Sequence, residues 1–280
     1  MLKIDSHQHF WNYDPESHAW ITDEMGILKQ HFLPPDLKVE LDRVEIDGSV
    51  AVQADQTEHE TEYLLQFAEQ YDYVTGVVGW LDIRADNFAE RLEHYSGHDK
   101  LVGLRHIVQD EPDDRFLLRP DFLRGINILT DFALTYDILI FARHLPVAVA
   151  FTEHFPDQKF VLDHIAKPEI ADQKIDEWEN GIRELARHPN IWCKVSGLVT
   201  EADWEQWKPD DFKPYLDVVF DAFGVDRLMY GSDWPVCKLA AEYGEVYSLV
   251  DDYTSGMSDA ERAAFFGGNA VDCYGLQANE

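Results

Sequence analysis

The sequence places two histidines two positions apart in the stretch IDSHQHFW, residues 4–11. In an extended strand alternate side chains face the same side, so His7 and His9 would reach toward the same point. Neutral imidazoles in this arrangement can bind a divalent ion, or they can donate hydrogen bonds to a carbonyl or hydroxyl group of a substrate. The spacing by itself leaves both roles open.

Two later motifs carry further groups that can act on a bound molecule. Asp233 lies in YGSDWP, where its carboxylate could bind a metal ion together with His7 and His9, or act as a general base toward water. The structural alternative for Asp233 is a cap of the following turn. His164 lies in DHIAKP and could either bind the metal or polarise a substrate carbonyl.

Arg105 and Lys194 are candidate donors to a substrate. A guanidinium group offers several donors in a fixed geometry, which suits a carboxylate, a carbonyl or a polyol. The structural alternative for Arg105 is a salt bridge to Asp137 or Asp82, and the alternative for Lys194 is a pair with a neighbouring carboxylate. The sequence does not decide between these roles.

Four other side chains complete the candidate substrate-binding set: Gln53, Trp80, His106 and Trp11. Aromatic walls combined with polar partners suit a sugar-sized ligand. A tryptophan at the end of a strand is also an ordinary packing residue, so each one taken singly favours packing.

The elements that must position these residues are short apolar runs separated by longer amphipathic segments, a pattern typical of a parallel sheet with crossover helices. We predict eight strands, over residues 2–8, 47–55, 73–83, 101–108, 134–141, 159–166, 190–197 and 226–234. In a closed barrel of such strands, catalytic groups lie at the carboxyl ends. Most of the candidate residues fall near those ends, so we expect them to converge on one rim.

Apolar residues recur on one face of the segments 57–71 and 174–189, which predicts two of the crossover helices. Ser258 and Glu261 have the spacing of a capping box, which predicts a helix near the C-terminus. No glycine-rich phosphate turn follows the first strand, and this disfavours a doubly wound sheet. We therefore predict one (β/α)8 barrel domain over residues 1–280, with a long first connection at about 11–45 that forms an ordered flap over the barrel mouth.

The composition excludes several classes of partner. The chain has 54 acidic and 23 basic residues, a formal net charge of −31, so we expect neither nucleic acid nor an anionic membrane surface to bind it. Its three cysteines, Cys193, Cys237 and Cys273, lack the spacing of a disulfide framework or a thiolate zinc site. No secretory signal is visible, and a cytoplasmic location is expected.

These motifs resemble the amidohydrolase superfamily, specifically its amidohydrolase-2 group, which contains sugar-acid lactonases of the L-fuconolactone and L-rhamnonolactone hydrolase type. The likeness runs nearly end to end. It rests on DSHQHFW, FLPPDL, GVVGWLDI, LVGLRH, DHIAKP, KVSGL, YGSDWPV and GGNAVDCYGL. The combination of DSHQHFW, DHIAKP and GSDWPV is specific for the group.

The resemblance implies a (β/α)8 barrel whose active site holds His7 and His9 from the first strand and Asp233 from the eighth. It implies that Asp233 activates a water that attacks a lactone carbonyl, and then returns the proton to the ring oxygen. His164 matches the later histidine of the group, and Arg105 matches the strand-four position that faces substrate.

The chain departs from the two-metal members of the superfamily, because LVGLRH has no lysine at the strand-four position and LTYDILIF has no histidine. The resemblance therefore implies either no required cofactor or one divalent ion, with zinc preferred, on His7, His9 and Asp233, with His164 as an alternative ligand. Without an ion, the opening histidines would contact the carbonyl or hydroxyl groups of the substrate.

Three other functions stay open. Hydrolysis of a dicarboxylate lactone would need more basic groups at the rim than Arg105 and Lys194, and a metal-dependent decarboxylation would need a firm zinc site. A non-catalytic sugar-binding barrel is the third, and the retained Asp233 and His164 speak against it. The expected partner is a small sugar lactone, and the oligomeric state, a homo-oligomer included, is left open.

Overall fold

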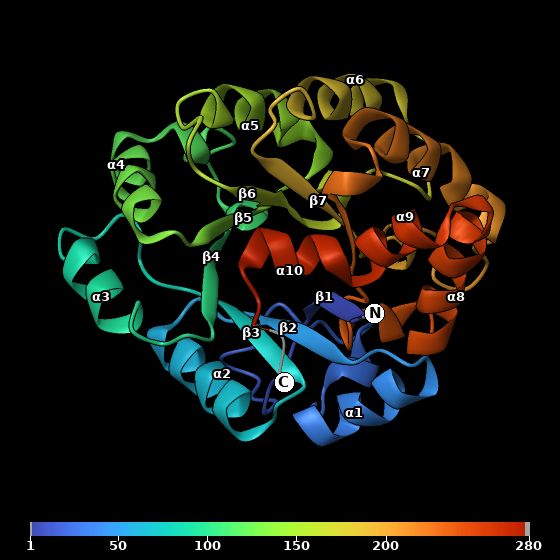
Figure 1. The fold of residues 1–280 in the computed structure, drawn as a ribbon, viewed down its shortest axis with the longest axis horizontal. Helices are drawn as coiled ribbons and strands as arrows, with labels where there is room; N and C mark the ends of the chain where they lie inside the picture. The colour runs from blue at the N-terminus through green and yellow to red at the C-terminus, as the bar shows by residue number, and fades with distance from the viewer. Residues whose placement is uncertain (1, 278–280) are drawn as a thin grey trace.

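Eight parallel strands form one sheet in sequential order, and a bridge between Gln8 and Trp234 joins the first strand to the segment after the last (Figure 1). The computed structural model describes residues 2–277. The predicted (β/α)8 barrel is confirmed, and each predicted strand is present at its core. The strands are β1 Ile4–Gln8, β2 Gly48–Val52, β3 Val74–Gly79, β4 Leu101–Ile107, β5 Thr135–Leu139, β6 Phe160–Leu162, β7 Ile191–Val195 and β8 Leu228–Tyr230.

Helices form a ring around this sheet (Figure 1). Both predicted crossover helices are present, as α2 and α6, and each buries its apolar stripe in the hydrophobic core. Ser258 caps α9, because its hydroxyl accepts the backbone N–H of Glu261 at 3.3 Å. The helices are α1 Pro34–Arg43, α2 Glu58–Gln70, α3 Phe88–Tyr95, α4 Pro120–Leu129, α5 Leu145–Thr152, α6 Asp176–Leu185, α7 Pro209–Phe223, α8 Tyr243–Tyr253, α9 Asp259–Ala263 and α10 Asn269–Tyr274.

The end of the barrel where the strands begin is covered by α10 (Figure 1). Cys273 and Tyr274 of this helix pack in one apolar cluster with Ile4, Val50 and Met229 of the strands. Burial of this cluster removes apolar surface from water and closes that end. The opposite end, where the strands stop, is the end at which barrels of this kind build their active sites.

The connection between β1 and α1 is held by aromatic contacts. Trp11 pairs with Phe32 as an antiparallel bridge, and its ring packs edge-on against Trp20. The first barrel helix, α1, begins at Pro34, where the proline ring presets the helical φ angle. The connection between β1 and α1 therefore spans residues 9–33, and the rest of the predicted flap includes α1.

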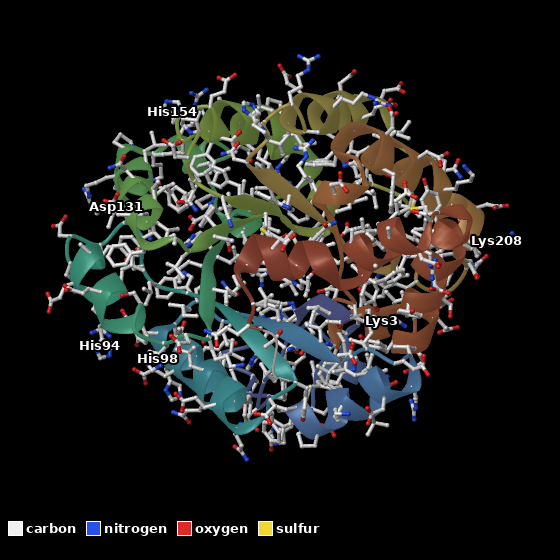
Figure 2. All side chains as sticks on the ribbon, in the orientation of Figure 1. Lys3, His94, His98, Asp131, His154 and Lys208 are labelled. Carbon is white, nitrogen blue, oxygen red and sulfur yellow. The ribbon has the colours of Figure 1, made fainter. Side chains whose placement is uncertain are left out.

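Charged and other polar side chains project from the outer surface of the barrel into solvent. Figure 2 labels several that are exposed, among them His94, Asp131, His154 and Lys208. Within residues 2–277, no helix combines the length and the apolar character that crossing a membrane requires.

Candidate active site

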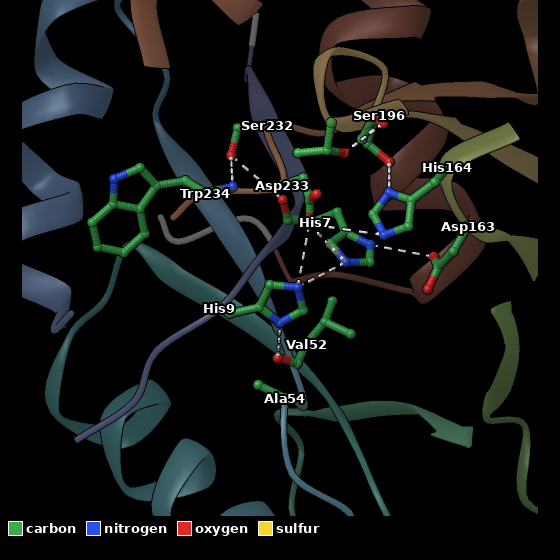
Figure 3. Close-up of polar contacts among 12 residues, drawn as sticks. His7, His9, Val52, Ala54, Asp163, His164, Ser196, Ser232, Asp233 and Trp234 are labelled. Atoms are coloured by element: carbon green, nitrogen blue, oxygen red, sulfur yellow. Dashed lines mark hydrogen bonds and ion pairs between the residues drawn. The ribbon is translucent and has the colours of Figure 1, made fainter. Parts of the chain in front are cut away.

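The carboxylate of Asp233 lies among three imidazole rings (Figure 3). Its Oδ1 is 3.4 Å from Nε2 of His9, and 3.8 Å from Nε2 of both His7 and His164. The two Nε2 atoms of His7 and His9 are 3.2 Å apart. Four residues that sequence reasoning took from strands one, six and eight thus meet at one point.

Backbone contacts between β1 and the segment after β8 fix the position of Asp233. The N–H of Asp233 donates to the carbonyl of His7 at 2.8 Å, and the N–H of His9 donates to the carbonyl of Trp234 at 2.7 Å. Beneath them the buried Asp5 accepts the N–H of Ser232 at 2.9 Å and that of His7 at 3.1 Å. Asp233 itself has a positive φ of 58°, so the segment holds it in a left-handed conformation.

His164 reaches the site from a left-handed turn after β6. Four consecutive residues, from His164 to Lys167, have φ angles between 46° and 59°. Its Nδ1 lies 2.9 Å from the hydroxyl of Ser196. Gly197 lies beside the ring, where a Cβ would come within 2.6 Å of Nδ1, so a side chain at 197 would displace the imidazole.

The hydrogen-bond partners of His9 and His7 limit which ring nitrogen carries the proton. Nδ1 of His9 is 2.7 Å from the carbonyl of Val52, which only accepts, so the proton of neutral His9 is on Nδ1 and Nε2 is free to accept. Nδ1 of His7 is 3.2 Å from both Oδ1 of Asp163 and Nζ of Lys194, and these two neighbours permit either tautomer. With its proton on Nδ1, His7 also presents a free Nε2.

The donor atoms at this point fit a divalent metal ion. One ligand atom each from His7, His164 and Asp233 lie within 4.8 Å of one another, and all three residues are buried. Two imidazoles and one carboxylate are a common ligand set for zinc, and each ring is held by a further partner on its other nitrogen. The set differs from the predicted one in that His164 takes the place of His9, which lies beside it.

Burial and charge together set the protonation of the site. Burial works to raise the pKa of Asp233, but the electrostatic attraction of His164 and the hydrogen-bonding contact with His9 outweigh it and hold that pKa below its ordinary value. Burial lowers the pKa of His164 to about 4, against the attraction of Asp233. At neutral pH Asp233 is therefore an ionised carboxylate beside a neutral His164, as a general base requires.

Lys194 lies in the barrel interior and is fully buried. Its Nζ is 2.6 Å from Oδ2 of Asp137 and 3.0 Å from Oδ1 of Asp163. The hydroxyl of Tyr274, from α10, donates to Asp137 at 2.7 Å. Lys194 therefore pairs with neighbouring carboxylates, and its ammonium contacts His7 rather than open space.

Arg105 is held by a different carboxylate from the two that the sequence suggested. Its Nη1 is 2.9 Å from Oδ2 of Asp163 and 3.3 Å from Nε2 of His7. Its Nη2 donates to the backbone carbonyl of Gln53 and to the Oε1 of that residue. Gln53 thus positions Arg105, which lies at the edge of the cavity described next.

Asp233 opens onto a cavity of about 340 Å³ at the carboxyl ends of the strands. This volume suits a small molecule. Four of the predicted residues line it. Ile107 and Leu139, the last residues of β4 and β5, also line it, and the other lining residues follow the strands. The lining consists of His9, Trp20, Met25, Ala54, Arg105, Ile107, Gln109, Asp110, Leu139, Phe141, His164, Lys167, Thr200, Glu201, Trp204, Asp233, Val236 and Leu239.

Three more of the predicted residues, His106, Trp80 and Trp11, lie near the site but are not among the described residues that line the cavity. His106 accepts the indole N–H of Trp80 at 3.3 Å, and its Nε2 is 2.7 Å from Oε1 of Glu111. Trp11 is almost fully buried and donates to the carbonyl of Gln30 at 2.9 Å. These contacts give His106, Trp80 and Trp11 packing and hydrogen-bonding roles in the walls.

Among the polar or aromatic lining residues that sequence reasoning missed are Lys167, Glu201 and Trp204. Lys167 stands in the same DHIAKP stretch as His164, three residues later, and that proximity was an available signal. Glu201 and Trp204 belong to the connection after β7. No strand-end position or spacing marks them in the sequence.

Comparison with known proteins agrees with this site. A family model described as amidohydrolase matches residues 4–276. Two curated relatives are L-fucono-1,5-lactonases: one from Burkholderia multivorans is 44% identical, covering 98% of this chain and 96% of its own length. The other, from Burkholderia ambifaria, is 35% identical, covering 98% and 95%.

A crystal structure of an amidohydrolase from Burkholderia multivorans with bound zinc superimposes with a TM-score of 0.96 at 44% identity. The superposition covers 99% of this chain and 100% of the other. The full-length family match, together with the histidines and the aspartate gathered at the carboxyl ends of the strands, shows that the chain belongs to the amidohydrolase family.

Proposed function

We propose that this chain hydrolyses the ring ester of an aldonolactone, such as L-fucono-1,5-lactone, to the open-chain aldonate. The observation that carries the proposal is the buried carboxylate of Asp233, which three histidines surround at a cavity of about 340 Å³. The 44% identity to a curated L-fucono-1,5-lactonase supports the choice of substrate class.

Asp233 is the general base of the proposed reaction. It takes a proton from water as the water oxygen bonds to the lactone carbonyl carbon. The bond from that carbon to the ring oxygen then breaks, and the proton passes from Asp233 to the ring oxygen, which becomes a hydroxyl group. The carboxylic acid product ionises, so each turnover releases one proton to solvent.

His164 polarises the lactone carbonyl in this scheme. When the hydroxyl of Ser196 donates to Nδ1, the proton of neutral His164 is on Nε2, the nitrogen nearest Asp233. An N–H at that place can donate to the carbonyl oxygen as negative charge develops there. Arg105 also lines the cavity, and its Nε, which has no hydrogen-bond partner within the described residues, is a second donor for the substrate.

A divalent ion fits the same donor set. His7, His164 and Asp233 would hold it, with His9 beside them. When bound, such an ion supplies Lewis-acid polarisation of the carbonyl. The residues of the chain would still orient the lactone and move the proton.

The test is proton release on adding L-fucono-1,5-lactone, measured with untreated enzyme and with enzyme stripped by a chelator and verified free of metal. We expect hydrolysis well above the spontaneous rate in the untreated sample. Equal hydrolysis rates in both samples would mean that His7 and His9 contact the substrate. If the activity is lost on removal of metal and recovered on adding zinc, the site holds a catalytic ion. Failure of the untreated enzyme with fucono-, rhamnono- and galactonolactones contradicts the proposal.

A further inference from the structure

A second charged pair lines the cavity that holds Asp233. Nζ of Lys167 lies 3.8 Å from Oε1 of Glu201, and both side chains keep about a fifth of their surface exposed, at 19% and 21%. Nζ of Lys167 also lies 5.7 Å from the centre of the Phe141 ring, another lining residue. The distance of 3.8 Å is too long for a direct hydrogen bond. The ammonium of Lys167 can therefore still donate to a ligand, and the carboxylate of Glu201 can still accept from one.

Two connections bring this pair together. Lys167 ends the left-handed turn that begins at His164, so one strained segment supplies both a residue beside Asp233 and a residue of the pair. Glu201 ends a short 3-10 helix, Val199–Glu201, in the connection after β7. The indole N–H of Trp204 donates to the carbonyl of Thr200 at 2.9 Å and holds an aromatic wall beside Glu201.

The cations that line the cavity are already matched by carboxylates. Among the described lining residues, Arg105 pairs with Asp163 beneath it and Lys167 pairs with Glu201. Two further acids, Asp110 and Asp233, also line the cavity. A ligand with its own carboxylate would find no unmatched cation there and would lie close to several negative charges.

The walls of the cavity also contain uncharged hydrogen-bonding groups that have no partner within the described residues. The indole N–H of Trp20 and the side-chain oxygen of Gln109 are buried and have no hydrogen-bond partner within the described residues. Both side chains line the cavity. A donor and an acceptor left in this way are suited to the hydroxyl groups of a sugar, which both donate and accept.

We propose that the Lys167–Glu201 pair is the subsite that recognises the hydroxyl groups of the lactone and selects uncharged polyhydroxy lactones over lactones with a second carboxylate. Glu201 accepts from a substrate hydroxyl and Lys167 donates to one, and the charge on each side chain strengthens its bond. Glu201 also neutralises Lys167, so the ammonium cannot serve as a receptor for a carboxylate. This inference rests on the proposed function for the reaction itself.

The test uses Glu201→Gln with two probes. For hydrolysis of L-fucono-1,5-lactone, we expect KM to rise by about tenfold with kcat little changed. The amide oxygen of Gln still accepts from the hydroxyl, but it lacks the charge that strengthens this bond in both the ground and the transition state. For 2-pyrone-4,6-dicarboxylate as a competitive inhibitor, we expect the inhibition constant to fall by about tenfold, because the charge of Lys167 is now free for a carboxylate.

Two variants control this result. The double variant Lys167→Met with Glu201→Gln should lose the tighter binding of the dicarboxylate, because the freed cation is gone. Glu179→Gln removes a carboxylate from a comparable pair with Arg183 on the outer helix α6, and both constants should keep their wild-type values. If Glu201→Gln does not fold, Lys167→Met alone is tested, and its KM for the fuconolactone should rise by about tenfold with kcat kept.

The outcomes separate this inference from the proposed function. Wild-type hydrolysis together with an unchanged KM and an unchanged inhibition constant in Glu201→Gln overturns the subsite and leaves the lactonase standing. Tighter dicarboxylate binding that persists in the double variant also overturns it, because Lys167 would then not be the group released. A wild-type enzyme that hydrolyses no aldonolactone contradicts both.

Discussion

Asp233 shows how the surroundings of one residue set its chemistry. Burial alone favours the neutral carboxylic acid, which could not accept a proton from water. The nearby His164 and His9 reverse that preference and hold the pKa below its ordinary value. The left-handed backbone at Asp233, with φ at 58°, then fixes where the carboxylate points.

Replacement of Asp233 by asparagine removes the base and keeps the shape of the side chain. Asparagine tolerates a left-handed conformation, so we expect the fold to be retained. The turnover rate on L-fucono-1,5-lactone should fall by about 10²- to 10⁴-fold, the usual contribution of a general base. Steady-state kinetics measures the rate, and circular dichroism with thermal melting checks the fold. If Asp233→Asn keeps the wild-type activity, another residue is the general base.

Lys194 is the residue whose loss should cost most stability near the site. Its ammonium is fully buried between Asp137 and Asp163, and it contacts Nδ1 of His7. The substitution Lys194→Met would leave two buried carboxylates without that cation, so we expect the free energy of unfolding to fall by about 3–5 kcal/mol. Urea denaturation measures the change.

The double variant Lys194→Met with Asp137→Asn is the matched control for that prediction. It removes one of the stranded carboxylates, so it should recover part of the loss. Equal unfolding midpoints for wild type and Lys194→Met would show that the buried pair contributes nothing.

At the scale of elements, the start of α2 holds the segment that follows β2. The carboxyl group of Glu60, buried near the start of α2, accepts the N–H of Ala54 at 3.0 Å and that of Asp55 at 2.7 Å. Ala54 lines the cavity, so this contact fixes part of its wall. Burial raises the pKa of Glu60 to about 8, against the two backbone donors, which favour the ionised form.

This shift predicts a pH dependence of stability. Between the ordinary value of 4.5 and about 8, folded Glu60 keeps a proton that the unfolded chain has released. Stability from this group should therefore fall as the pH rises through that window, by up to about 1.4 kcal/mol per pH unit. Urea midpoints across the window should decline less steeply in Glu60→Gln, whose amide does not titrate. Parallel declines in the two proteins would show that Glu60 ionises normally in the folded state.

At the scale of the whole molecule, charge dominates the surface. A formal net charge of −31 spread over the outer face makes the compact state repel itself. Several exposed helix pairs, such as Lys213 with Asp217, offset only a little of this, because solvent screens them.

Salt should therefore stabilise the protein. Raising sodium chloride from about 0.1 M to about 1 M shortens the screening length from about 10 Å to about 3 Å, which weakens repulsion between exposed carboxylates. We expect a higher melting temperature in the salt, with most of the gain reached well before the highest concentration. Sucrose at equal osmolality separates screening from general solute effects. A melting temperature that does not respond to salt would mean that self-repulsion is unimportant.

The sequence by itself determined the barrel and the ends of its strands. Alternation of apolar runs with amphipathic segments is a local pattern, and it predicted all eight strands and both crossover helices that were named. Because the carboxyl ends of parallel strands meet at one rim, it also predicted that His7, His9, His164 and Asp233 would lie together. Local periodicity and strand direction carry that information without any knowledge of the loops.

Only the tertiary structure decided which partner each polar group meets. Asp163, which the sequence did not single out as a partner, holds Arg105 and lies against Lys194 and His7. Lys167 and Glu201 meet because a left-handed turn and a short 3-10 helix from two different connections face the same cavity. The conformation of such connections depends on contacts between segments far apart in the chain, and no spacing within one segment encodes it.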